Sequence, residues 1–169
     1  MANKRCVLLV LAAQLWAGAA AAQAPSPPAP PPTTPYGAPI GIDDAKKAAA
    51  AAVAEVPKAG SPPDAIAIVD HGGFLIYFER MDNAQLGSVE IAIEKARSAA
   101  LFRRPSKVFE DALAAGGVGM RILALHGALP VEGGVPIVSG GKLVGAIGAS
   151  GGTAQQDGQV AKAGADAIK

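Results

Sequence analysis

The chain has 169 residues, with 15 basic and 14 acidic side chains, a formal net charge of +1, two histidines and one cysteine. So balanced a charge gives no electrostatic reason to expect nucleic acid or an anionic surface as a partner. The sequence also lacks a nucleophile triad, a metal-ligand cluster and a phosphate-binding loop of recognised spacing. These observations exclude several common kinds of site and leave binding of a small molecule or another protein open.

Residues 1–22 have the pattern of a secretory signal peptide. Lys4 and Arg5 give a charged start, an apolar stretch follows, and the segment ends in small residues. The apolar stretch is short for a membrane span, so we expect cleavage, export to the periplasm or beyond, and no membrane span afterwards. Cys6 would leave with the signal, and the mature chain would have no thiol or disulfide chemistry.

Residues 23–40 are dominated by proline, which favours an extended, solvated segment without a core of its own. We expect a disordered tether here. Residues 41–169 have the length of one domain with a single hydrophobic core.

The expected elements of this domain follow in chain order. They are a helix from Asp43 to about Val56, a strand over 65–69, a strand over 74–80, a helix over 89–102, a helix over 106–113, a loop with a possible short strand over 120–129, a hairpin over 133–151 and a helix over 154–168. Ser88 and Thr153 are the expected N-caps of two of the helices. The order predicts an α+β fold, with an antiparallel sheet of about five strands and helices packed against it.

The hairpin over 133–151 carries the strongest local signal. Gly140 and Gly141 suit the positive φ of a tight hairpin turn. The second strand is left bare on one side by its glycines, which are Gly145, Gly148, Gly151 and Gly152. We therefore expect another backbone, a helix or a flat ligand to approach this strand closely.

Five blocks in order resemble the GlcG/HbpS family of haem-binding proteins. They are Ala-Ile-Val-Asp-His-Gly-Gly-Phe-Leu (67–75), Glu-Arg-Met-Asp (79–82), Glu-Lys-Ala-Arg-Ser-Ala (94–99), Gly-Gly-Val-Pro-Ile (133–137) and Gly-Ala-Ile-Gly-Ala-Ser-Gly-Gly (145–152), closed by Gln156-Asp157. The resemblance implies a profilin-like fold, homo-oligomers, and binding of haem, a related tetrapyrrole or iron. It also implies, for exported members, a part in sensing haem or redox stress together with an envelope sensor protein.

Four residues are the candidates for a haem site. A haem needs an apolar surface, one or two axial donors, and cations near its propionates. His71 and His126 are the only imidazoles and the candidate ligands of haem iron, while Arg80 and Lys95 are the candidate partners of the propionates. Each also has a simpler interpretation, as a turn or loop histidine, a strand-end ion pair or a solvated helix charge.

Two further groups are weighed as ligands. Met81 and Met120 have soft sulfur atoms that can bind iron, but methionine more often fills a core. Glu90 and Glu94 stand one helical turn apart, a spacing that is usually solvated.

The sequence favours an exported, non-enzymatic haem-binding protein. The alternatives are a small enzyme or accessory factor acting on a 2-hydroxy acid or in haem degradation, and a structural oligomeric protein of the envelope. Catalysis is disfavoured because no general base is evident beside Arg80 or Lys95.

Overall fold

Four antiparallel strands form the sheet at the centre of the domain. The computed structural model describes residues 34–169. The strands are β1 (Ala65–Asp70), β2 (Leu75–Arg80), β3 (Gly134–Ser139) and β4 (Lys142–Ser150), in the spatial order β2-β1-β4-β3. This confirms the predicted α+β class, with four strands where about five were expected. The predicted signal peptide and most of the tether fall on residues 1–33, outside the described part.

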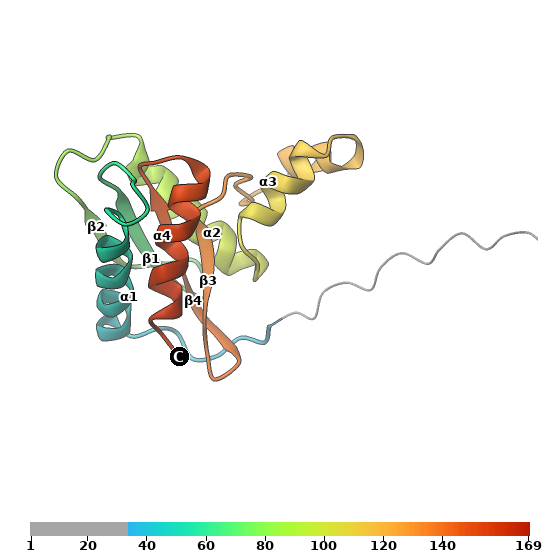
Figure 1. Ribbon diagram of the computed structural model, residues 1–169. Helices are drawn as coiled ribbons and strands as arrows, with labels where there is room; N and C mark the ends of the chain where they lie inside the picture. Colours follow the sequence, from blue (N-terminus) through green and yellow to red (C-terminus); the bar gives the residue numbers. More distant parts are fainter. Residues whose placement is uncertain (1–33) are drawn as a thin grey trace, which may run out of the picture. The chain divides into compact units, whose positions relative to one another are not determined.

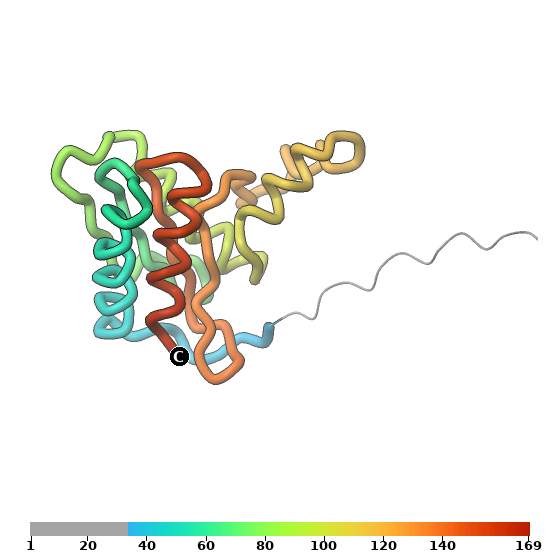
Figure 2. Tube along the Cα trace, viewed as in Figure 1, coloured from blue at the N-terminus to red at the C-terminus, as the bar shows by residue number. Residues whose placement is uncertain are grey.

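Helices cover both faces of the sheet (Figure 1). Helix α2 (Ser88–Phe102) packs on one face, against β1, β3 and β4. Helices α1 (Ile42–Glu55) and α4 (Ala154–Asp166) pack against each other on the other face. Figure 2 shows these two helices side by side although they come from opposite ends of the domain.

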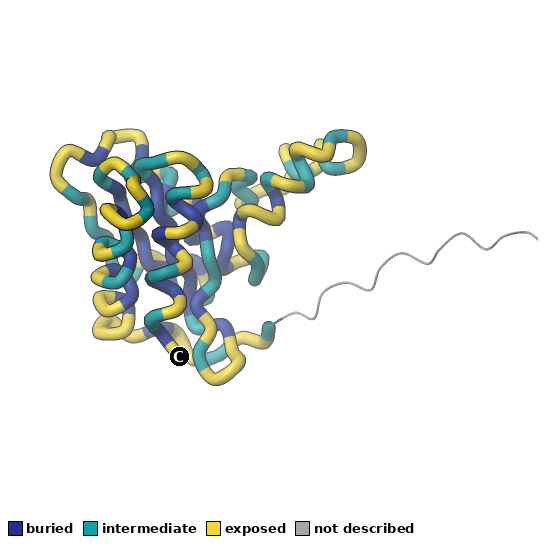
Figure 3. Tube along the Cα trace, in the orientation of Figure 1, coloured by how far each residue is buried: buried dark blue, intermediate teal, exposed yellow. Residues whose placement is uncertain are grey.

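The period of two along β1 explains this layering. Ile66 and Ile68 point to the α1 and α4 side, whereas Ala65, Ala67 and Val69 point to α2. The two central strands, β1 and β4, lie in the buried centre of the molecule (Figure 3). The large side chains therefore fill one side of the sheet, and small side chains let α2 lie close on the other.

The bare strand of the hairpin is where α2 makes its closest approach. A Cβ atom placed on Gly148 would lie 2.0 Å from the carbonyl oxygen of Ala92. The prediction that another element approaches this strand is confirmed, and the element is a helix. This surface of the sheet is consequently not free to receive a flat ligand.

The turn and cap predictions had different outcomes. Gly140 and Gly141 have φ angles of 55° and 74°, as the hairpin required. Thr153 caps α4 in a capping box with Gln156. Ser88 is not an N-cap: it is buried as the first residue of α2, where its hydroxyl accepts a hydrogen bond from the Ser150 hydroxyl.

An arm leaves the body of the domain between α2 and β3 (Figure 1). It consists of helix α3 (Lys107–Ala114) and the 3₁₀ helix η1 (Gly117–Ala124). The expected loop with a possible short strand over 120–129 is thus a 3₁₀ helix followed by a turn, with no strand. Glycines explain the difference, because Gly116 and Gly117 have positive φ and a Cβ on Gly119 would lie 1.8 Å from the Ala112 carbonyl oxygen.

Candidate functional site

Lys95 is buried and paired with Asp157. Its side chain is 1% exposed, and its Nζ atom lies 2.6 Å from Asp157 Oδ2 and 3.1 Å from the Ala149 carbonyl oxygen. The other oxygen of Asp157 accepts hydrogen bonds from the amides of Gly151 and Gly152. Lys95 therefore has no exposed surface to offer a propionate, which corrects the interpretation of this residue as a ligand contact.

Asp64 lies next to this pair and was not anticipated from the sequence. One of its carboxylate oxygens accepts a hydrogen bond from the Ser61 hydroxyl at 2.9 Å, and the other is buried without a partner among residues 34–169. Burial, reinforced by the negative charge of Asp157, raises the pKa of Asp64 from 3.8 to about 6. The Asp64 amide donates to the sulfur of Met81 at 3.4 Å, so Met81 has a structural contact here.

Arg80 lies at the end of the β1–β2 hairpin that is opposite to the turn containing His71. It ends β2 and is exposed, opposite Ala65 in the β1–β2 register, while His71 lies in the turn at the other end of the two strands. Six residues of strand separate the two positions by about 17 Å. The structure thus does not bring Arg80 to a site that contains His71.

His71 occupies the turn between β1 and β2. The Asp70 carboxylate shapes this turn by accepting hydrogen bonds from the amides of Gly72, at 2.8 Å, and Phe74, at 2.9 Å. The imidazole ring lies 5.7 Å from the ring of Tyr36. Its Nδ1 atom is buried and has no hydrogen-bond partner within the described part of the chain. A buried nitrogen left in this state is uncommon and marks His71 as a candidate ligand.

Cations and apolar side chains surround the same turn. The guanidinium of Arg97 donates through Nε to the Gly73 carbonyl at 3.0 Å. Arg103 lies 5.0 Å above the Tyr36 ring and donates to the Thr34 carbonyl. Phe74, which is 70% exposed, follows in the turn, and Leu101 of α2 packs near Gly73. We call this region, made of His71, Phe74, Arg97, Leu101 and Arg103, the turn surface.

His126 is exposed in the turn that follows η1. Its neighbour Gly127 lines a hollow of about 260 Å³ together with Glu94, Arg97, Leu101, Ala128 and Leu129. His71 and His126 therefore both lie near the C-terminal half of α2, through Gly73 and Gly127, which each approach Leu101. His71 thus belongs to the turn surface, whereas His126 lies outside it, next to Gly127 in the following turn, and Arg80 and Lys95 lie elsewhere.

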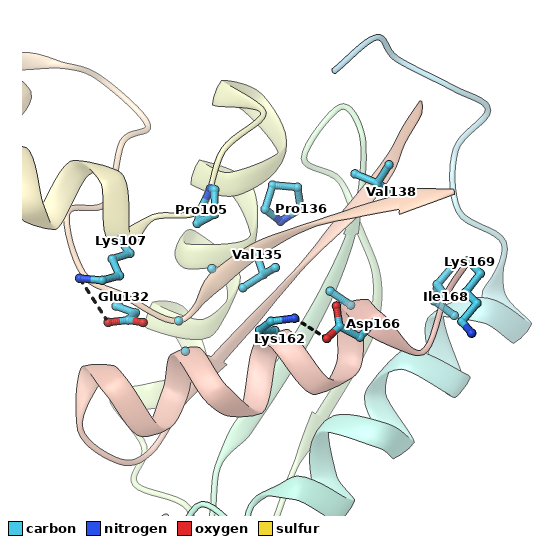
Figure 4. A pocket seen from close by; sticks show the side chains of 14 residues that line it. Pro105, Lys107, Glu132, Val135, Pro136, Val138, Lys162, Asp166, Ile168 and Lys169 are labelled. Carbon is cyan, nitrogen blue, oxygen red and sulfur yellow. Dashed lines mark hydrogen bonds and ion pairs between the residues drawn. The ribbon is translucent and has the colours of Figure 1, made fainter. Parts of the chain in front are cut away.

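A larger cavity of about 660 Å³ lies between β3, α4 and the start of α3 (Figure 4). Its apolar wall includes Val135, Pro136 and Ile168. Its charged residues face one another: Lys162 pairs with Asp166, and Lys107 lies 4.0 Å from Glu132. Burial raises the pKa of Glu132.

This cavity is poorly suited to haem iron. None of the residues that line it is a histidine, methionine, tyrosine or cysteine, the usual axial donors. Across residues 34–169, moreover, no group of three or more His, Cys, Asp or Glu side chains is placed to hold a bare metal ion. The turn surface is the part of the described structure that combines an imidazole, cations and exposed apolar side chains.

Comparison with known proteins settles the family. The family model described as "Haem degrading protein HbpS-like" matches residues 40–166. The chain belongs to this family. The GlcG/HbpS resemblance of the five sequence blocks is thereby confirmed.

Individual relatives agree with this assignment. Protein GlcG of Escherichia coli K12 is 42% identical over 85 residues, which are 50% of this chain and 62% of GlcG. The crystal structure of HbpS is 30% identical with a TM-score of 0.70, over 79% of this chain and 92% of HbpS. The crystal structure titled "PduOC:Heme Complex" is 26% identical with a TM-score of 0.68, over 78% of this chain and 96% of that protein.

Proposed function

We propose that this HbpS-like protein binds haem at the turn surface, with the imidazole of His71 as the iron ligand. The observation that carries the proposal is the likeness to PduOC, a protein solved in complex with haem, which this chain covers over 96% of its length. The family description, which names haem, supports the same ligand. Sequence and fold thus support the ligand class, and the local chemistry supports the proposed place.

The residues of the turn surface fit the group. Haem iron accepts an imidazole nitrogen as an axial ligand. The Nδ1 atom of His71 makes no hydrogen bond within residues 34–169, so no contact of the described protein commits this nitrogen. The exposed ring of Phe74 and the side chain of Leu101 offer apolar contact to the macrocycle.

Two arginines supply the charge that haem propionates require. Arg97 uses Nε on the Gly73 carbonyl, which leaves its terminal guanidinium nitrogens available to a carboxylate. Arg103 is held over Tyr36 at the edge of the same surface. These two residues replace Arg80 and Lys95 as the proposed propionate partners.

The proposed setting is the periplasm or the exterior of the cell. The pattern of residues 1–22 supports export, and the proline-rich segment after it supports a tether between the domain and the envelope. We keep the proposal that the protein reports haem or redox stress to an envelope sensor protein. No helix in the described part of the chain is long and apolar enough to span a membrane.

The family description favours degradation of haem as a second candidate function. A 2-hydroxy acid substrate loses one of its two alternative cations, because Lys95 is buried in its pair with Asp157, whereas Arg80 is exposed. Degradation would be recognised as loss of the haem absorbance when a reductant and dioxygen are added, faster with the protein than with free hemin.

Titration with hemin tests the proposal. Wild-type protein should shift the Soret band away from that of free hemin, and His71→Ala should weaken the affinity by about tenfold or more. His126→Ala is the matched control, since it removes an exposed imidazole outside the turn surface and should retain the wild-type band. A Soret band equal to that of free hemin with wild-type protein would refute haem binding, and equal affinities of wild type and His71→Ala would refute the ligand.

A further inference from the structure

The cavity between β3 and α4 has no part in the haem proposal. Its volume of about 660 Å³ lies within the range that is usual for small-molecule sites in proteins. Val135, Pro136 and Ile168 form an apolar wall, and Figure 4 shows Glu132 at one end of the cavity and Lys169 at the other. The cavity therefore suits a molecule with an apolar body, and the charges of the lining decide what its polar end must be.

Glu132 is the least exposed of the charged side chains that line this cavity. Its side chain is 18% exposed, whereas the other charged lining side chains are exposed; they are Lys107, Lys162, Asp166 and Lys169. An exposed charge is already solvated and gains little from a partner, but a charge that is mostly withdrawn from water needs one of opposite sign. The lining thus favours a ligand that answers Glu132 and not one that answers the lysines.

The carboxylate of Glu132 is incompletely neutralised. Within residues 34–169 the one cation in ion-pair range is Lys107, whose Nζ lies 4.0 Å away and is already 2.7 Å from Asp111. The carboxylate of Glu110 is also close, because it accepts a hydrogen bond from the Glu132 amide. Burial and the negative charges of Glu110 and Asp111 raise the pKa of Glu132, and Lys107 opposes them only in part. The partner that this end of the cavity lacks is a cation.

The fold holds the Glu132 carboxylate in place. Gly158 of α4 leaves room for it, since a Cβ atom at this position would overlap Glu132 Oε1. The residues on either side are fixed by Ser106, whose hydroxyl donates to the Val131 carbonyl at 2.7 Å and accepts from the Gly134 amide at 2.9 Å. A charged group held by its neighbours in this way binds a ligand with little loss of side-chain freedom.

We propose that this cavity binds a small organic amine, with its ammonium group on the Glu132 carboxylate and its apolar body along Val135, Pro136 and Ile168. The ammonium group would donate charge-assisted hydrogen bonds to a carboxylate whose nearest lysine is shared with Asp111. The site uses no residue of the turn surface, so the inference does not depend on the haem proposal.

Calorimetric titration of the whole protein with three molecules that share a phenylethyl body tests the charge. Wild type should bind 2-phenylethylamine, should bind the neutral 2-phenylethanol about tenfold more weakly or worse, and should bind the anionic 3-phenylpropanoate more weakly still. Lengthening the amine to 4-phenylbutylamine should tighten binding by about fourfold for each added methylene, because the apolar wall takes up the longer body. This series decides the preferred charge without any variant.

Glu132→Gln tests the carboxylate itself. The change keeps the size of the side chain, and it should weaken 2-phenylethylamine by about tenfold or more while leaving 2-phenylethanol within about twofold. Asp166→Asn is the matched control, because it removes a carboxylate from the lining of the same cavity that is exposed and paired with Lys162. It should leave the affinity for the amine within about twofold, as should His71→Ala at the turn surface.

Three results would overturn the proposal. They are wild-type protein that does not bind 2-phenylethylamine, 2-phenylethanol or 3-phenylpropanoate bound as tightly as the amine, and an amine affinity that Glu132→Gln leaves unchanged. A loss of amine affinity in His71→Ala equal to the loss in Glu132→Gln would place the amine outside this cavity and overturn it as well.

Discussion

Replacing Lys95 by methionine should destabilise the domain substantially. Lys95 and Asp157 are 1% and 3% exposed, and breaking such a buried ion pair by removing one partner costs about 3–5 kcal/mol. Methionine keeps the apolar stem, and Asp157 still accepts hydrogen bonds from Gly151 and Gly152. The cost should therefore lie near the lower limit, about 3 kcal/mol.

Asp157→Asn should cost more, about 5 kcal/mol, because it leaves the Lys95 cation buried with only the Ala149 carbonyl as a charge-stabilising contact. Urea unfolding followed by circular dichroism measures both changes. Lys162→Met is the matched control, since Lys162 forms an exposed pair with Asp166 that contributes about 0.5 kcal/mol or less.

The result that would refute this reasoning is a Lys95→Met variant as stable as Lys162→Met. Equal losses of stability in Lys95→Met and Asp157→Asn would refute the argument that the amides of Gly151 and Gly152 make removal of Lys95 less costly than removal of the Asp157 charge. The folded Lys95→Met protein should also bind hemin as wild type does, because Lys95 has no surface at the turn.

Three further outcomes follow from single sites. Gly148→Ala should lower stability by about 1–3 kcal/mol in thermal unfolding, because its Cβ would meet the Ala92 carbonyl, whereas Gly41→Ala, with open space around it, should not. Burial raises the pKa of Asp64 to about 6, so between about pH 4 and 6 the native state holds a proton that the unfolded state has lost, and stability falls as pH rises through this range. Asp64→Asn should consequently be about 1–3 kcal/mol more stable than wild type above pH 7 and match it at pH 4, and a difference independent of pH would contradict the assignment. Arg80→Ala should leave hemin affinity within about twofold of wild type, and a tenfold loss would place the ligand elsewhere.

The layers of the fold could be predicted because their signals are local. Alternation along Ala65–Asp70, the glycines of the hairpin turn and the Thr153 cap each lie within a few residues of the structure that they determine. The arm could not be predicted to the same degree. Its 3₁₀ helix depends on the contact of Gly119 with Ala112. The spacing of apolar residues in the sequence does not predict this contact.

The site depends on contacts between distant residues. Lys95 and Asp157 are 62 positions apart, and Tyr36 meets His71 only because the segment before α1 runs alongside β4. A signal for Lys95 was present in the sequence, since helical spacing places it on the face that carries Ala92, Ala96 and Ala99. That face packs on the sheet, so a lysine on it must be buried and needs a carboxylate.

The central claim is that haem binds at the turn surface through His71. A crystal structure of the protein grown with hemin tests it most directly. We predict iron on an imidazole nitrogen of His71, the macrocycle against Phe74 and Leu101, and propionates on Arg97 or Arg103. Haem in the cavity lined by Val135, Pro136 and Ile168, or iron bound by any residue other than His71, would contradict it.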